Sequence, residues 1–85
     1  MDLENYRKEI DEIDSRILEL LGQRREVALK VGQYKRAQGI AIYAPEREKE
    51  LLESKVVLAE KYSLSKSFVQ KVFQEIVEYC RGVQQ

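Results

Sequence analysis

The stretch from Tyr6 to Gln38 constrains the fold of this chain more than any other part of the sequence. Its apolar residues recur at alternating steps of three and four, the spacing of a long amphipathic helix with a coiled-coil-like seam. The series is Tyr6, Ile10, Ile13, Ile17, Leu20, Val27, Val31 and Tyr34. Between Leu20 and Val27, where the spacing calls for an apolar residue, the sequence has Arg24. The pattern therefore predicts one long helix with a cation inside its apolar stripe.

A second row on the same side of this predicted helix contains three cations. The row is Arg7, Ile10, Asp14, Ile17, Leu21, Arg24, Ala28, Val31 and Lys35. On a helix, Arg24 and Lys35 lie about 16 Å apart along the axis and nearly on one face. Arg7 lies about 42 Å from Lys35. No small ligand could contact both Arg7 and Lys35 of one chain.

The ends of three helices are predicted from local sequence. The first begins near Leu3 with Asp2 as its N-cap, and ends before Gly39. Pro45 suits the first position of a second helix, which runs to about Lys61. Ser65 can cap a third helix. With no strand pattern, we expect an all-α fold with one long and two shorter helices.

Several residues of the shorter helices are expected to face inward. For the second helix these are Leu51, Leu52, Val56, Leu58, Ala59 and Tyr62. In the third helix one face contains Phe73, Val77, Cys80 and Gln84, at steps of four, three and four. Two interior glycines of the first helix, Gly22 and Gly32, suggest either close helix packing or backbone approach to a ligand.

Composition excludes several classes of protein. The 85 residues form one predicted domain, 1–85, in which 15 basic and 15 acidic residues balance. We therefore expect no nucleic-acid or membrane partner, and we expect neither a signal peptide nor a membrane span. Cys80 is the single cysteine, which suits a cytoplasmic location. The absence of histidine excludes Ser-His and Cys-His catalysis and zinc-type metal sites.

The length of the first helix favours a homodimer. A helix of about 36 residues is about 54 Å long, whereas a compact chain of this size has a radius of gyration of about 12 Å. One end would expose its apolar residues to water unless two long helices pack together, antiparallel about a two-fold axis. An axis crossing near Leu18 or Glu19 sets the partner's Arg7 opposite the space between Arg24 and Lys35.

Converging cations from two chains suit a small polyanion. A lone arginine is often explained by a salt bridge or by a stem lying along apolar surface, but a buried unpaired guanidinium is costly. Guanidiniums bind carboxylates through paired, charge-assisted hydrogen bonds. The second helix adds Arg47 and Glu48, although both could be solvated in its first turn, and the third adds Gln84 near the chain end. Without an evident nucleophile or base, such a site suits positioning and charge stabilisation.

These residues resemble those of a known family. The segments are RKEIDEIDSRILELL (7–21), QRREVALKVGQYK (23–35), PERE (45–48) and QQ (84–85). Together they resemble the all-helical class of chorismate mutase over essentially the whole chain. The resemblance implies an intertwined all-α homodimer with two shared sites. It also implies conversion of chorismate to prephenate by a Claisen rearrangement, on the shikimate route to phenylalanine and tyrosine, without a cofactor.

The resemblance also implies roles for individual residues. The partner's Arg7 and Arg24 would clamp the two substrate carboxylates. Lys35 would contact a carboxylate and the ether oxygen whose bond breaks, and Gln84 would donate to that oxygen from the other side. Lys35, Gln84 and Arg24 are thus the expected catalytic residues.

The remaining implied contacts concern the ring of the substrate. Glu48, in line with inward-facing positions, would bind the ring hydroxyl, and Arg47 would help to hold this region. Two positions depart from the family pattern. Ala44 stands where an acidic residue is frequent, and Cys80 stands where a small hydroxyl residue is common; a thiol there is a weaker donor. Packing alone would equally explain Cys80.

Three other functions stay open at this point. A related lyase that removes pyruvate from isochorismate would use the same helical scaffold. A non-catalytic helical dimer could bind an aromatic-pathway metabolite as a regulatory domain. A purely structural coiled coil is the last alternative, and it predicts that Arg24→Leu raises stability without loss of function.

Overall fold

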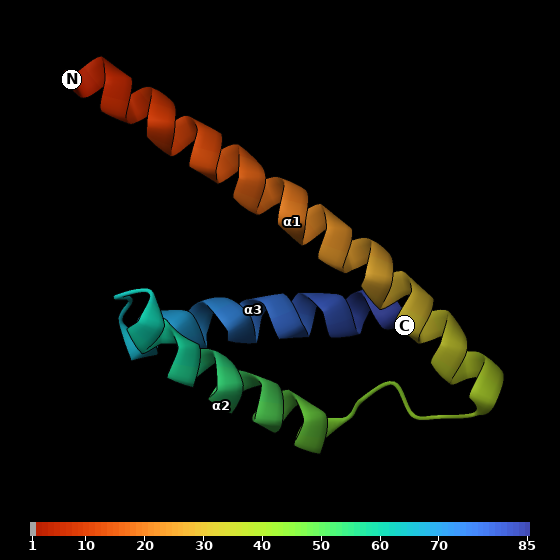
Figure 1. The fold of residues 1–85 in the computed structure, drawn as a ribbon. Helices are drawn as coiled ribbons and strands as arrows, with labels where there is room; N and C mark the ends of the chain where they lie inside the picture. Colours follow the sequence, from red (N-terminus) through yellow and green to blue (C-terminus); the bar gives the residue numbers. More distant parts are fainter. Residues whose placement is uncertain (1) are drawn as a thin grey trace.

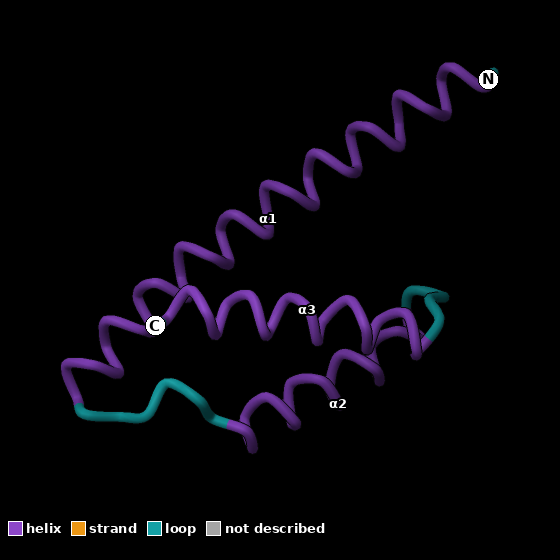
Figure 2. The backbone as a smooth tube through the Cα atoms, turned by 180° about the vertical axis from the view of Figure 1, so that it is seen from behind, coloured by secondary structure: helices purple, strands orange, loops and turns teal. Residues whose placement is uncertain are grey.

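The computed structural model describes residues 2–85 as three helices. These are α1 (Leu3–Gln38), α2 (Pro45–Lys61) and α3 (Lys66–Gln84). Helix α3 packs against both α1 and α2, and the C-terminus lies beside α1 (Figure 1). No strand occurs between residues 2 and 85, where loops alone join the helices (Figure 2). The predicted all-α fold of one long and two shorter helices is confirmed.

Local capping sets both ends of α1, as predicted. The Asp2 side chain accepts a hydrogen bond from the backbone N–H of Asn5 at 3.0 Å, which satisfies one of the free donors of the first turn. Gly39 ends the helix with φ of 68°, a left-handed conformation that glycine adopts without steric cost. The backbone N–H of Ile40 then donates to the carbonyl of Lys35 at 2.8 Å and closes the helix.

The shorter helices also begin where predicted. Pro45 occupies the first turn of α2, where its missing N–H has no intrahelical partner in any case. The Ser65 hydroxyl accepts from the backbone N–H of Phe68 at 3.3 Å and caps α3. Between them, Ser63 has a positive φ of 56°, which turns the chain sharply enough to place α3 against α2.

Small residues allow α1 and α3 to pack closely. On α1, Ala28 and Gly32 are buried at a spacing of four, so they lie on one face. A Cβ on Gly32 would lie 2.7 Å from the backbone oxygen of Gln84. Of the two explanations for the interior glycines, close helix packing holds for Gly32. At Gly22 an added Cβ would meet no atom of residues 2–85 within 4 Å, so among these residues nothing packs closely against this glycine.

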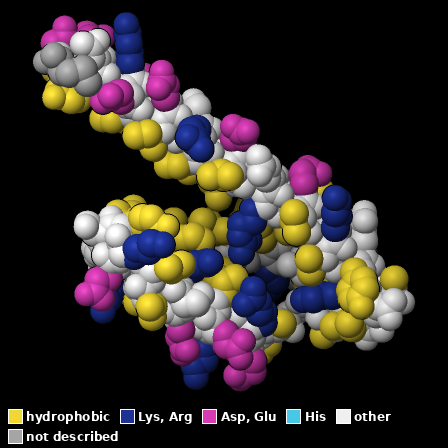
Figure 3. Space-filling view, in the orientation of Figure 1, with side chains coloured by type: hydrophobic (Ala, Val, Ile, Leu, Met, Phe, Trp, Pro, Cys, Tyr) yellow, Lys and Arg dark blue, Asp and Glu magenta, His cyan; other side chains and the backbone are white. Residues whose placement is uncertain are grey.

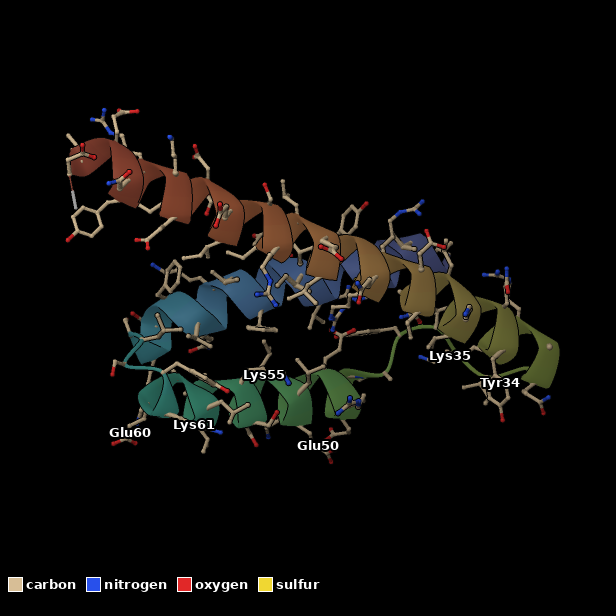
Figure 4. All side chains as sticks on the ribbon, turned by 45° about the horizontal axis from the view of Figure 1, so that its top comes forward. Tyr34, Lys35, Glu50, Lys55, Glu60 and Lys61 are labelled. Atoms are coloured by element: carbon tan, nitrogen blue, oxygen red, sulfur yellow. The ribbon has the colours of Figure 1, made fainter. Side chains whose placement is uncertain are left out.

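The inward face of α2 differs in part from the prediction. Ala59 is buried and Val56 half-buried, and Lys55, on the side of α2 toward α3 (Figure 4), lies over the Phe73 ring at 5.7 Å. The prediction that Leu58 and Tyr62 face inward is wrong, because both side chains are exposed. The reason is rotational, since Leu58 precedes buried Ala59 by one position and so points about 100° away from it.

The molecule is elongated. Its principal extents are 55 × 24 × 15 Å, with a radius of gyration of 16.0 Å, so its long dimension equals the length predicted for the first helix. The N-terminal half of α1 projects away from the other helices (Figure 1). Hydrophobic side chains follow the edge of this projection that faces α2 and α3 (Figure 3). Tyr6, Ile10, Ile13 and Ile17 are each at least 50% exposed.

Candidate active site

A cavity of about 450 Å³ lies where α1, α2, α3 and the segment before α2 meet. Six of the seven residues predicted to form the site line it: Arg24, Lys35, Arg47, Glu48, Cys80 and Gln84. They come from three helices, so only the tertiary structure brings them together. Apolar walls, including Val27, Val31 and Val77, complete the lining.

Helix α1 contributes Arg24 and Lys35 from one face, as predicted. Arg24 is half-buried and forms no ion pair within residues 2–85, so the salt-bridge explanation for this cation does not hold in this chain. The Lys35 Nζ donates to the carbonyl of Ile42 at 2.9 Å, which ties the segment before α2 to α1. An ammonium has three N–H donors, so Lys35 retains two for a ligand.

On the part of the wall that α2 and α3 form, Glu48 and Arg81 make a two-pronged ion pair. Arg81 Nε donates to Glu48 Oε2, and Arg81 Nη2 donates to Glu48 Oε1, each at 3.0 Å. Glu48 thus faces inward, as predicted, with 21% of its side chain exposed. The hydrogen bond to Glu48 raises the pKa of Arg81 above its usual value, despite opposing desolvation. Arg81 also lies over the Tyr43 ring, 4.6 Å from its centroid.

Arg81 is a lining residue that was not predicted from the sequence. It directly follows Cys80 and precedes Gln84 by three positions, which sets it beside the predicted face of α3. This spacing could have identified it. Its partner Glu48 lies 33 positions away on another helix, so the sequence provided no indication of the pair.

The last turn of α3 places Gln84 in the cavity. Its backbone oxygen accepts a hydrogen bond from the guanidinium of Arg36, and Gly32 leaves room for its backbone. The side-chain Oε1 of Gln84 is buried without a hydrogen-bond partner in the described structure. A buried polar atom of this kind costs about 1–3 kcal/mol when unsatisfied. The Gln84 side chain can therefore form a hydrogen bond with a ligand. It would accept through Oε1, or donate through its N–H groups if the amide is rotated.

The two positions that depart from the family pattern also line the cavity. Cys80 is buried, with a thiol that is a weak hydrogen-bond donor. Ala44 precedes α2 and offers no side-chain cap. Arg47 lines the cavity from the first turn of α2 and is exposed.

Arg7 is the predicted site residue that the chain does not bring to this cavity. It lies in the projecting part of α1, where it is exposed and pairs with Glu4 at 3.2 Å. Because α1 is continuous from Leu3 to Gln38, Arg7 cannot approach Lys35 of the same chain.

The charge of the cavity favours an anion. Four cations, Arg24, Lys35, Arg47 and Arg81, face one carboxylate, Glu48, which leaves three net positive charges in the lining. Residues 2–85 contain no cluster of His, Cys, Asp and Glu that could hold a metal ion. Over the same range, no helix has the length and hydropathy needed to cross a membrane.

The all-α fold and the cation-rich cavity between its helices place this chain in a class of small helical proteins with a site suited to a compact anion. Within that class, this chain belongs to the chorismate mutase type II family, whose model matches residues 6–85. The match includes every predicted site residue.

Curated relatives agree with the family assignment. A chorismate mutase of Methanocaldococcus jannaschii is 35% identical over 82 residues, which are 96% of this chain and 83% of that protein. A bifunctional chorismate mutase/prephenate dehydratase of Buchnera aphidicola is 37% identical over 73 residues, 86% of this chain. The T-protein of Haemophilus influenzae is 35% identical over 75 residues, 88% of this chain. The aligned region spans only 19% and 20% of these last two proteins.

Proposed function

We propose that this chain is a chorismate mutase, an isomerase that rearranges chorismate to prephenate in the biosynthesis of phenylalanine and tyrosine. The observation that supports this most directly is the cavity itself. Arg24 and Lys35 of α1 and Gln84 of α3 line one space with a net positive charge, in a chain of the chorismate mutase type II family.

The first task of the site is to hold the substrate in a reactive shape. Chorismate has two carboxylates, and Arg24 and Lys35 extend long cationic side chains into the cavity from positions about 16 Å apart along one helix face. Charge-assisted hydrogen bonds from these cations, completed by the partner's Arg7 in the dimer proposed below, bind both carboxylates and hold the enolpyruvyl arm over the ring. Orientational entropy is then lost on binding and not in the chemical step.

The second task is to stabilise charge in the transition state. As the C–O bond of the ether stretches, negative charge increases on its oxygen. Lys35, with N–H donors free beyond its bond to Ile42, would donate to this oxygen. Gln84 would donate to it through its amide N–H groups, with the amide rotated so that they take the place of the unsatisfied Oε1. These bonds strengthen as charge develops, so they accelerate the reaction as well as binding the substrate.

Other lining residues would orient the ring. Glu48 accepts a hydrogen bond from the ring hydroxyl, and Arg47 adds positive charge near the same wall. Cys80 lies one turn before Gln84 and contributes packing with a weak donor. No cofactor takes part in these steps.

We also propose that the active form is an intertwined antiparallel homodimer in the cytoplasm, with both sites shared. Large exposed apolar side chains follow α1, including Ile10, Ile13 and Ile17, and monomers rarely expose contiguous apolar surface of this kind. Antiparallel packing about an axis near Leu18 would cover them. It would also bring the partner's Arg7 toward Arg24, supplying the missing carboxylate clamp.

Incubating the purified protein with chorismate and measuring prephenate tests the proposed activity. We expect turnover by the wild type and its loss in Arg24→Ala. Isochorismate, offered separately, should give no salicylate. Binding of chorismate without turnover by a dimeric protein would refute the enzymatic proposal and favour a metabolite-binding domain.

A further inference from the structure

The ion pair between Arg81 and Glu48 joins two helices on the wall of the cavity. Arg81 is on α3 and Glu48 is in the first turn of α2, and they are connected by two parallel hydrogen bonds of 3.0 Å. Both side chains are largely covered, with 32% and 21% of their surfaces exposed. The pair is thus part of the cavity lining and not a pair on the outer surface.

The two-pronged geometry fixes the orientation of the Glu48 carboxylate. A single hydrogen bond would let the carboxylate rotate, whereas a guanidinium fork holds both oxygens in one plane. Each carboxylate oxygen has two acceptor sites, so each retains one after bonding Arg81. Glu48 therefore presents acceptors to the cavity in a defined direction.

Arg81 also contacts an aromatic ring in addition to Glu48. Its guanidinium lies over the Tyr43 ring at 4.6 Å from the centroid, an arrangement in which a cation is attracted to the aromatic face. Tyr43 belongs to the segment that Lys35 ties to α1 through Ile42. The position of Arg81 thus depends on α3, on α2 and on the connecting segment together.

From this arrangement we propose that Arg81 is a positioning residue, which fixes Glu48 as the acceptor for a ring hydroxyl and so makes the site select hydroxyl-bearing ring diacids. This proposal rests on the proposed function of the cavity. Arg81 acts through Glu48 because its Nε and Nη2 donors are already bonded to that carboxylate. Three N–H donors of the guanidinium remain beyond this fork, so the test below separates positioning of Glu48 from a direct contact between Arg81 and a substrate carboxylate.

A carboxylate acceptor with a fixed orientation favours substrates that carry a ring hydroxyl. A site built to bond a substrate hydroxyl can reject the analogue that lacks it by up to about 10⁴-fold where the acceptor is then left buried and unpaired. Glu48 keeps its two bonds to Arg81 and 21% of its side chain is exposed, so we expect a smaller ratio here. If the carboxylate can rotate, it can find other partners, and the penalty falls. Loss of Arg81 should therefore reduce the preference more than it reduces binding of the diacid itself.

The test compares chorismate with its analogue in which hydrogen replaces the ring hydroxyl. Wild type, Arg81→Met, Arg81→Lys, Glu48→Ala and the double variant Glu48→Ala/Arg81→Met are measured with both compounds. Lys71→Met, which removes an exposed cation from the same helix, is the matched control. Both kcat/KM and the dissociation constant by calorimetry are recorded, after circular dichroism has shown each variant to be folded.

We expect the preference for chorismate to fall at least tenfold in Arg81→Met, with no change in Lys71→Met. Arg81→Lys should lose most of the preference too, since an ammonium keeps the charge but not the fork. In the Glu48→Ala background, Arg81→Met should add little, because its partner is gone.

Two results would overturn the proposal. Equal losses with both compounds would mean that Arg81 binds a carboxylate or supports the fold, and additive losses in the double variant would mean that it acts independently of Glu48. Failure of the wild type to convert chorismate would refute the proposed function instead. In that case the ratio of dissociation constants still decides the role of Arg81.

Discussion

Gly32 of α1 and Gln84 of α3 are in direct backbone contact, with no room for a side chain between them. A Cβ on Gly32 would lie 2.7 Å from the backbone oxygen and 2.8 Å from the Cα of Gln84. Arg36, one turn further along α1, donates to the same backbone oxygen. The position of the Gln84 amide in the cavity therefore depends on two α1 residues that need not contact the substrate.

Replacing Gly32 with alanine should move Gln84. Alanine favours a helix by about 1 kcal/mol relative to glycine, but here its methyl group meets backbone, which cannot rotate away. We expect a net destabilisation of about 1–3 kcal/mol, as for other overpacked sites, and a fall in kcat of at least tenfold. Urea unfolding and steady-state kinetics measure the two effects.

Gly22→Ala is the matched control for this prediction. No atom of the part of the chain that the structure describes lies within 4 Å of a Cβ at Gly22, so the substitution should leave activity unchanged and raise the free energy of unfolding by up to about 1 kcal/mol. If Gly32→Ala behaved in the same way, the contact with Gln84 would not constrain the site.

Removing the Arg36 guanidinium should loosen the last turn of α3. Arg36→Met keeps most of the length of the side chain but cannot donate to the Gln84 backbone. Because the role proposed for Gln84 is confined to the ether oxygen, we expect kcat to fall about tenfold while KM changes little. Arg36→Lys, which can still donate, should recover part of the loss; similar kinetics for both variants would argue against this hydrogen bond.

Sites shared between two chains predict complementation. Arg7→Ala and Arg24→Ala should each be inactive, since every site then lacks one clamp. Refolding an equal mixture should restore about a quarter of the wild-type activity, because half of the dimers are mixed and each has one intact site. Mixed dimers, identified by native mass spectrometry, that show no activity would exclude a site built from both chains.

Replacing the Gln84 amide with a carboxyl group should make the activity depend on pH, with the highest activity in acid. In Gln84→Glu the carboxyl can donate to the ether oxygen only while protonated. Activity should be highest at low pH and fall as the pH rises through the pKa of the new carboxyl, which burial raises. Gln85→Glu, at an exposed neighbouring position, should keep the wild-type profile. A Gln84→Glu profile matching that of the wild type would remove this amide from the mechanism.

The sequence by itself determined the helices and part of the site. Asp2, Gly39, Pro45 and Ser65 act within a few residues of their own positions, so helix ends follow from local hydrogen bonding and backbone preference. Helical periodicity likewise set Arg24 and Lys35 on one face, because the repeat of a helix does not depend on what packs against it.

Only the tertiary structure decided which helices share a wall. Arg81 meets Glu48 across 33 positions, and Gly32 meets Gln84 from another helix. Both contacts depend on how far each helix is rotated about its axis and how closely the backbones approach, which small residues and side-chain volumes determine together. The rotation of α2 about its axis also exposes Leu58, which was predicted to face inward. Adjacent positions on a helix point about 100° apart, so Leu58 faces solvent while its neighbour Ala59 is buried.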